Sequence, residues 1–291
     1  MKPAAFTYHR PGSLAEALDL LSEHGDEGKI LAGGQSLVPA MNFRLAQPAA
    51  LIDINRVSEL AFVEPSPAGG VRIGATTRQR TAEQSTLVAE RAPLLHQALP
   101  SIAHVQIRNR GTVGGSVAHA DPAAELPAVM LALGARMHAR SRRGARWIDA
   151  EDFFTGLLST ALAPDEILVE IELPPVPATA GHAFHELARR SGDYALVGVA
   201  VQITRDPLGR VATARIALLG VGESPVLART VAAELVGKLP SAEGLRAAAE
   251  AISDDIDPHG DVHATSMYRG HLARVLVGRA LADACALSDP R

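Results

Sequence analysis

The sequence predicts an α+β protein whose two domains meet near residue 177. Three observations support this fold class. Up to about residue 173, short apolar strands alternate with helical segments, whereas after residue 181 strands come first and helices follow. Between the two parts, residues 174–181 read Pro-Pro-Val-Pro-Ala-Thr-Ala-Gly, a composition typical of a linker.

Length and composition agree with a globular protein. At 291 residues the chain can bury two hydrophobic cores, and with 3% aromatic residues these cores are aliphatic. A net charge of -4 without any basic block excludes a nucleic-acid-binding surface. The single cysteine, Cys285, excludes an internal disulfide and a cysteine-ligated iron–sulfur cluster held by this chain alone.

Hydropathy gives an expectation for localisation. No apolar run approaches the roughly 18 residues needed to span a bilayer. Residues 1–6 are not followed by the apolar segment of a secretion signal. We therefore expect a cytoplasmic protein, and any association with the inner membrane face to go through a partner.

The first helix carries its own start and stop signals. Ser13 and Glu16 form a capping-box pattern, an apolar stripe follows from Leu14, and Gly25 ends the helix. The other elements expected in the first part are strands at 29–32, 51–54 and 71–74, helices at 91–103 and about 123–133, and strands at 135–140, 146–148 and 167–173. In the second part we expect a three-stranded antiparallel sheet with strands at 182–190, 196–204 and 211–219. Helices follow at 227–236, 242–253 and 266–287.

Two glycine-rich loops are the most informative local feature. Gly33-Gly34 follows an apolar strand, and residues 111–116 (Gly-Thr-Val-Gly-Gly-Ser) precede an apolar helix. Without Cβ atoms, backbone N–H groups can approach an anionic ligand, and Gln35, Ser36 and Ser116 add donors. Neither loop is a Walker or Gly-x-Gly-x-x-Gly motif. The pattern predicts a phosphate or nucleotide ligand, with ordinary turns as the alternative.

Residues 29–37 (KILAGGQSL) and 107–117 (IRNRGTVGGSV) resemble the two flavin-binding motifs of the medium subunits of molybdenum hydroxylases. This group includes aerobic carbon monoxide dehydrogenase and the xanthine dehydrogenase relatives. Further stretches at 120–127, 164–168 and 191–195 are similar too, in family order, so that the resemblance covers nearly the whole chain.

The resemblance implies a fold and a division into domains. A vanillyl-alcohol-oxidase (PCMH)-type FAD-binding domain would cover residues 1–176, in two lobes of about 1–57 and 58–176. A smaller α+β domain, similar to the C-terminal domain of the carbon monoxide dehydrogenase flavoprotein, would cover residues 177–291. FAD would lie between the lobes without a covalent link.

The resemblance also implies cofactor contacts. The two loops would wrap the pyrophosphate and ribitol through Ala32, Gly33, Gly34, Gln35, Ser36, Leu37, Gly111, Thr112, Gly114, Gly115 and Ser116. Asp121 and Glu125 would contact the ribose or ribityl hydroxyls. Ile102 and Leu168 would pack on the adenine or the isoalloxazine ring system, and Tyr194 would stack near one flavin face. Asp121 could instead be a helix cap, and Tyr194 an anchor between domains. Valine at Gly33 or Gly114 is expected to place a branched side chain against the phosphates, abolishing flavin retention with the fold largely intact.

Several other features receive a structural interpretation. His185 falls where some relatives carry lysine near the flavin, and we expect it to have no redox role. Residues 220–225 are expected to form a turn. The aspartates and histidines of residues 254–263 are expected to be solvated surface and not a metal site. For Arg189, Arg190, Arg108 and Arg110, partner docking and phosphate binding both remain open.

By resemblance, the chain would be an electron-transfer subunit. A large molybdenum-cofactor subunit would hydroxylate the substrate, and a small subunit with two [2Fe–2S] clusters would pass electrons to FAD here. An external acceptor (oxygen, NAD or a quinone-linked carrier) would then be reduced, in an assembly that is a dimer of heterotrimers. No residue of this chain would act as acid, base, nucleophile or metal ligand.

Two alternatives belong to other classes: an independent flavoprotein oxidase or reductase of the same fold, and a non-catalytic nucleotide-binding assembly protein. Residues 114–125 depart from the Gly-Gly-Asn and Gly-Asp-Pro-Gly-Asn-Asp form associated with carbon monoxide enzymes. This departure favours an N-heterocycle or an aldehyde as the substrate of the complex.

Overall fold

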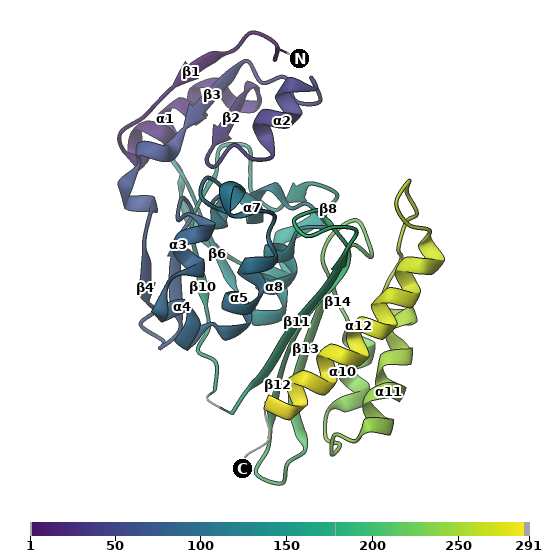
Figure 1. Cartoon of the computed structure of the whole chain (residues 1–291). Helices are drawn as coiled ribbons and strands as arrows, with labels where there is room; N and C mark the ends of the chain where they lie inside the picture. Colours follow the sequence, from purple (N-terminus) through teal and green to yellow (C-terminus); the bar gives the residue numbers. More distant parts are fainter. Residues whose placement is uncertain (1, 178, 288–291) are drawn as a thin grey trace.

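The computed structural model describes residues 2–177 and 179–287, and it has three parts that follow one another along the chain. Figure 1 shows the N-terminal lobe at the top, a second lobe below it, and a C-terminal part of long strands and helices at the lower right. The α+β fold with a two-lobed first domain is confirmed.

The N-terminal lobe is a small parallel sheet covered by one helix. Strand order is β1-β3-β2, with bounds Thr7–His9, Ala50–Asp53 and Gly28–Leu31. Helix α1 (Leu14–His24) begins and ends where predicted, because Ser13 accepts from the Glu16 N–H and Gly25 has a φ of 53°. The Glu16 carboxylate accepts from the N–H of Gly12 (2.8 Å). In a capping box it would accept from the N–H of the N-cap residue, Ser13, which is the next residue along the chain. A short helix, α2 (Leu37–Asn42), follows the first glycine loop.

The second lobe is built on an antiparallel sheet of order β4-β5-β10-β6-β7. Its strands are Val63–Pro65, Val71–Gly74, Ile167–Leu173, Arg136–Ser141 and Gly144–Asp149. A small hairpin, β8 and β9, has bounds Phe154–Gly156 and Ser159–Thr160. In β10, Ile167 and Val169 complete the core of the N-terminal lobe, and Leu168 joins that of the second lobe. A register shift between Leu168 and Glu170 changes the alternation, so that Ile171 also faces the second lobe.

The helices of the second lobe are short, and this explains where the prediction failed. The helices α3 to α9 have bounds Gln79–Glu83, Thr86–Arg91, Pro93–Ala98, Val105–Arg108, Val113–His119, Glu125–Leu133 and Ala150–Phe153. The helix expected at 91–103 is α5 alone, which passes into a 3-10 turn containing Pro100. Helices α3 and α4 were not predicted, because segments of five or six residues are too short for a helical period to show.

The C-terminal part is an antiparallel sheet covered on both faces. The expected meander β11-β12-β13 (Gly181–Ala188, Ala195–Arg205, Val211–Leu219) is extended by the two-residue β14 (Val226–Leu227). Helices α10, α11 and α12 (Arg229–Leu235, Ala242–Glu250, Ser266–Leu287) cover one face. Helices α5 and α8 of the second lobe cover the other face, so that these two parts share one apolar core.

The polar stretch 254–263 has structural roles. The Asp255 carboxylate accepts from the N–H groups of Thr230 and Val231 at the start of α10. Asp261 forms an ion pair with the buried Arg269 (2.8 Å). Within residues 2–177 and 179–287, no group of three or more His, Cys, Asp or Glu side chains could hold a metal ion. No described helix has the length and apolar character needed to cross a bilayer.

Candidate cofactor-binding site

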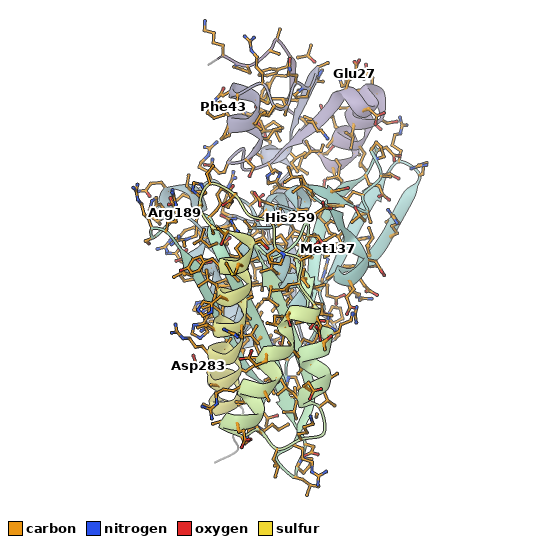
Figure 2. The ribbon with its side chains drawn as sticks, turned by 90° about the vertical axis from the view of Figure 1, so that its right-hand side faces the viewer. Glu27, Phe43, Met137, Arg189, His259 and Asp283 are labelled. Carbon is orange, nitrogen blue, oxygen red and sulfur yellow. The ribbon has the colours of Figure 1, made fainter. Side chains whose placement is uncertain are left out.

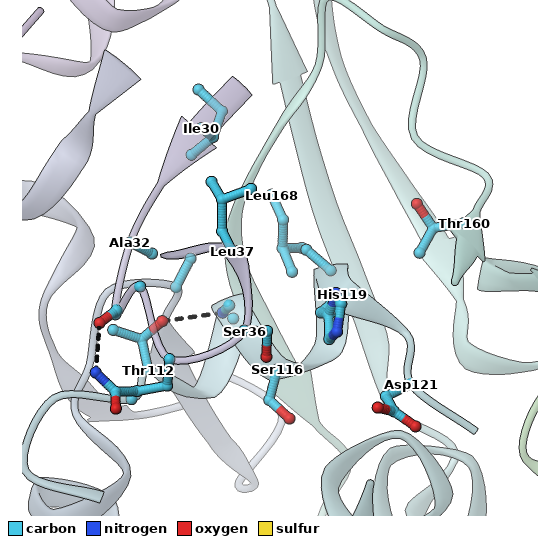
Figure 3. Close-up of a pocket in the computed structure, with 18 of the residues that line it drawn as sticks. Ile30, Ala32, Ser36, Leu37, Thr112, Ser116, His119, Asp121, Thr160 and Leu168 are labelled. Atoms are coloured by element: carbon cyan, nitrogen blue, oxygen red, sulfur yellow. Dashed lines mark hydrogen bonds between the residues drawn. The ribbon is translucent and has the colours of Figure 1, made fainter. Parts of the chain in front are cut away.

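A cavity of about 790 Å³ lies where the two lobes and the Tyr194 segment meet. In Figure 3, Ala32 and Leu37 lie on one side of it, and Asp121 and Thr160 on the other. All sixteen residues named from the sequence line this cavity: Ala32, Gly33, Gly34, Gln35, Ser36, Leu37, Ile102, Gly111, Thr112, Gly114, Gly115, Ser116, Asp121, Glu125, Leu168 and Tyr194. The structure thus brings the whole set together, and their contacts with a cofactor stay a prediction.

The first glycine loop supplies free backbone donors. It connects β2 to α2, and Gly34 has a φ of 74°, a left-handed conformation that favours glycine. The N–H groups of residues 33–37 find no acceptor among the described residues. Five consecutive free N–H groups beside a cavity, together with the Ser36 hydroxyl, form a donor set suited to a diphosphate.

The second glycine loop is different from the prediction. Gly114, Gly115 and Ser116 belong to the first turns of helix α7, which the sequence did not suggest. The N–H groups there are already bonded: Gly114 to the carbonyl of Ala75 (3.0 Å), and Gly115 to the hydroxyl of Thr112 (3.0 Å), the N-cap of the helix. These amides are therefore already occupied within the protein, and the side chain of Ser116 is what this segment can offer to a ligand.

The glycines also have a different role from the expected one at two positions. A Cβ on Gly33 would lie 2.6 Å from the carbonyl oxygen of Arg110 and 2.7 Å from Cα of Gly111. A Cβ on Gly114 would lie 2.5 Å from Cβ of Ala75. These glycines permit protein segments to touch, so we expect valine there to lower the stability of the chain as well as its flavin retention.

Acidic side chains occupy the far side of the cavity. The Asp121 carboxylate accepts from the N–H of Ala123 (2.9 Å), so it stabilises the turn before α8 and also lines the cavity. Glu125 is 7% exposed, and burial raises its pKa to about 7. Glu186, on β11, has its pKa raised to about 8 by burial and by the negative charge of Glu125. Burial and these acidic charges also raise the pKa of Tyr194.

These two glutamates predict a pH-dependent stability. Both folded-state pKa values lie above 4.5, so the folded protein binds the protons more tightly than the unfolded chain. We therefore expect the free energy of unfolding of the flavin-free chain to fall as the pH rises from about 5 to about 8. Urea titrations across this range should show a shallower fall for Glu186→Gln than for the wild type. An exposed control, Glu90→Gln, should keep the wild-type slope, and equal slopes in all three proteins would contradict the assignment.

Two groups of residues left open by the sequence lie outside the cavity. His185 bonds through Nε2 to Asp283 of α12 (2.8 Å; Asp283 is labelled in Figure 2), because alternate residues of β11 face the helices. Arg108 is 8% exposed and forms an ion pair with Glu83 (2.8 Å), so it is unavailable for docking. Arg189 lies 3.6 Å from Asp193 in an exposed ion pair.

Some lining residues carried no signal in the sequence. Gln79 is 5% exposed, and its Oε1 atom is buried without a hydrogen-bond partner in the part of the chain that the structure describes. His119, at the end of α7, and Thr160, of the β8–β9 hairpin, also reach the cavity. No spacing connects these positions with the glycine loops, because they meet the cavity only through the packing of the second lobe.

The lining as a whole suits a particular class of ligand. Free N–H groups stand at one end, carboxylates that can accept from hydroxyls stand at another, and Ile102 and Leu168 give an apolar wall. The residues therefore fit an elongated molecule with a diphosphate, hydroxyl groups and flat rings, as FAD is.

Comparisons with known proteins agree with this chemistry. Residues 4–176 match the family described as the FAD binding domain in molybdopterin dehydrogenase, and residues 182–284 match the CO dehydrogenase flavoprotein C-terminal domain. The chain is 42% identical to subunit alpha of the 6-hydroxypseudooxynicotine dehydrogenase complex of Paenarthrobacter nicotinovorans, over 100% of this chain and 98% of the relative. It is 42% identical to subunit beta of caffeine dehydrogenase of Pseudomonas sp. (strain CBB1), over 98% and 96%.

A solved structure is similar over nearly its full length. It is carbon monoxide dehydrogenase from Hydrogenophaga pseudoflava, in a form lacking the Mo-pyranopterin moiety. The TM-score is 0.96 and the sequence identity 40%, covering 99% of each chain.

Proposed function

The chain belongs to the FAD-binding medium subunits of the molybdenum hydroxylases, and from this premise we propose how its cavity holds FAD. It is the FAD-carrying electron-transfer subunit of a multi-chain oxidoreductase. The molybdenum cofactor and the iron–sulfur clusters belong to partner subunits.

The free N–H groups of residues 33–37 carry the assignment of the diphosphate site. Each hydrogen bond to a charged group contributes about 1.5–3 kcal/mol, so several of them together retain a dinucleotide without a covalent link. The hydroxyls of Ser36 and Ser116 add to this set, and Asp121 and Glu125 accept from ribose or ribityl hydroxyls. Gly34, with its left-handed φ of 74°, lets the backbone of the first loop come close to the ligand.

Ring binding is assigned to the apolar wall. Ile102 and Leu168 are 7% and 4% exposed and can pack on a flat ring system. Tyr194 is 64% exposed, comes from the C-terminal part, and stacks near one flavin face. A bound FAD would supply the capacity to take up single electrons and to give up two together. The residues of the chain bind and orient the cofactor and limit the access of water, and none of them acts on the organic substrate.

The wider assembly follows as part of the same proposal. Two [2Fe–2S] clusters of the small subunit deliver the electrons, and oxygen, NAD or a quinone-linked carrier removes them. A quinone-linked acceptor would bring the complex to the inner face of the membrane. Two heterotrimers form the assembly, and the large subunit selects the substrate. In this chain, residues 114–125 depart from the form associated with carbon monoxide enzymes, which favours an N-heterocycle or an aldehyde as that substrate.

A test of the proposed function uses the purified chain and the co-expressed complex. We expect the chain alone to bind FAD with a flavin absorption spectrum and no turnover of organic substrates. In the complex, the spectrum should contain flavin and iron–sulfur bands, with molybdenum present by elemental analysis. Oxidation of a substrate by the chain alone would favour an independent flavoprotein, and failure to take up flavin would favour an assembly protein.

A further inference from the structure

A hydrogen-bonded pair of side chains connects the two glycine loops from behind the cavity. Asn55, just after β3 of the N-terminal lobe, donates from Nδ2 to the carbonyl of Ala32 (2.7 Å). Its Oδ1 accepts from Nη2 of Arg78 in the second lobe (2.7 Å). Nη1 of Arg78 donates to the carbonyl of Arg110, beside the second loop. One continuous path of side chains therefore runs from the first loop to the second.

Both members of the pair are fixed by further contacts. The N–H of Asn55 donates to Asp53 (2.9 Å), whose other carboxylate oxygen accepts from the Tyr8 hydroxyl. Arg78 forms an isolated β-bridge with Thr112, and the next residue, Gln79, donates its N–H to the carbonyl of Gly111 (2.9 Å). Because Asn55 uses Nδ2 as donor and Oδ1 as acceptor at the same time, its amide has one orientation that satisfies both neighbours.

The loops meet in the same place. Gly33 approaches Arg110 and Gly111 so closely that a Cβ there would overlap their backbone atoms. The pair and this contact are thus two independent features that hold the lobes together directly beside the free N–H groups of residues 33–37. A diphosphate cradle requires donors at a fixed separation, which flexible loops joined to different lobes do not provide unaided.

The charge around the Arg78 guanidinium also differs from that of an ordinary exposed arginine. Burial and the positive charge of Arg110 both lower the pKa of Arg78, with Asp53 acting in the opposite direction. Neither guanidinium group lines the cavity, so their positive charge can act on a bound anion only from behind the glycine loops.

We propose that Asn55 and Arg78 are positioning residues that act as a latch between the two lobes and set the distance between the glycine loops that FAD requires. This inference rests on the proposed function for the identity of the ligand. The latch itself is a property of the chain. Neither residue is assigned a contact with the flavin, and the two act through the carbonyls of Ala32 and Arg110.

The test compares FAD binding by four proteins: wild type, Asn55→Ala, Arg78→Met and the double variant. Each single variant should raise the dissociation constant about tenfold or more, as the loss of a charged hydrogen bond does. Since the residues act in one path, the double variant should bind FAD little worse than the single variant that binds it more weakly.

A fifth protein, Arg78→Lys, tests the geometry of the guanidinium group. It keeps the charge but cannot make both bonds, so it should not restore FAD binding. Additive effects, or full binding by Arg78→Lys, would overturn the latch.

A matched control separates the latch from general charge loss. Arg80→Met removes a guanidinium from helix α3, whose N-cap is Arg78, but Arg80 contacts Glu83 and not the glycine loops. This variant should keep the wild-type dissociation constant for FAD. Equal weakening in Arg80→Met and Arg78→Met would show that only the overall charge matters and would contradict the proposal.

A second readout follows the lobes without any cofactor. Spin labels on cysteines introduced at the exposed Glu23 and Glu90, with Cys285 replaced by serine, report the distance between the N-terminal and second lobes. The distance distribution should be narrow in the wild type and broader in Arg78→Met. An unchanged distribution would overturn the latch whatever the ligand. If the wild-type chain fails to bind FAD while Arg78→Met still shows the broader distribution, only the proposed function is refuted.

Discussion

Gly33→Val is expected to abolish FAD retention and to lower the free energy of unfolding by about 1–3 kcal/mol, the usual cost of overpacking. Its Cβ alone would stand 2.6 Å from the Arg110 carbonyl oxygen and 2.7 Å from Cα of Gly111. Both neighbours are backbone atoms, so no rotation of a side chain relieves the overlap, and the loops must separate. The free N–H groups of residues 33–37 then lose their position relative to the second loop.

The measurements are the ratio of FAD to protein after gel filtration and a urea titration of the flavin-free chain. Gly270→Val, in helix α12, is the matched control, because a Cβ there meets no heavy atom within 4 Å. It should retain FAD fully and change stability little. A normal flavin content in Gly33→Val would contradict the close contact of the loops.

Arg108→Met should produce the largest loss of stability, about 3–5 kcal/mol, as expected when one partner of a buried ion pair is removed. The guanidinium contacts Glu83 (2.8 Å) and donates to the carbonyls of Ile102 (2.7 Å) and Ala103 (2.9 Å). Ala103 has a φ of 42°, unusual for a residue with a Cβ, and both carbonyls belong to the cavity wall. We therefore expect FAD affinity to fall together with stability.

The pH dependence of this loss gives an additional check. Burial acts to raise the pKa of Glu83, but hydrogen bonds from Arg108 and Arg80 hold it below its ordinary value. A lowered folded-state pKa contributes stability above the unfolded value of 4.5, and this contribution is lost as the pH falls. Urea titrations should thus show a larger difference between wild type and variant at neutral pH than near pH 4.

Arg80→Met is again a matched control. The Arg80 side chain is 35% exposed and contacts the same carboxylate (2.8 Å), so its removal leaves Arg108 in place. We expect a loss below about 1 kcal/mol, as for exposed ion pairs. Similar losses in both variants would show that the burial of Arg108 has no special energetic role.

The elements that the sequence predicted well are long and strongly patterned. The strands Ile167–Leu173 and Val211–Leu219 and the helix Ser266–Leu287 have the predicted bounds, because each is a long segment rich in buried apolar residues. Short segments were missed or misplaced, above all α7, whose Gly-Gly pair reads as a loop although Thr112 caps a helix there. In a segment of seven residues, tertiary hydrogen bonds outweigh the low helix propensity of glycine.

From the sequence by itself, local motifs identified the family by resemblance, and that resemblance implied the two-lobed fold and the sixteen residues that line one cavity. Only the tertiary structure decided which backbone donors are free, that Gly33 touches the second loop, and that Asn55 and Arg78 connect the lobes. Asn55 lies 23 residues from Ala32 and 23 from Arg78. Hydrogen bonds across such separations depend on how the lobes pack, and no local pattern specifies that packing.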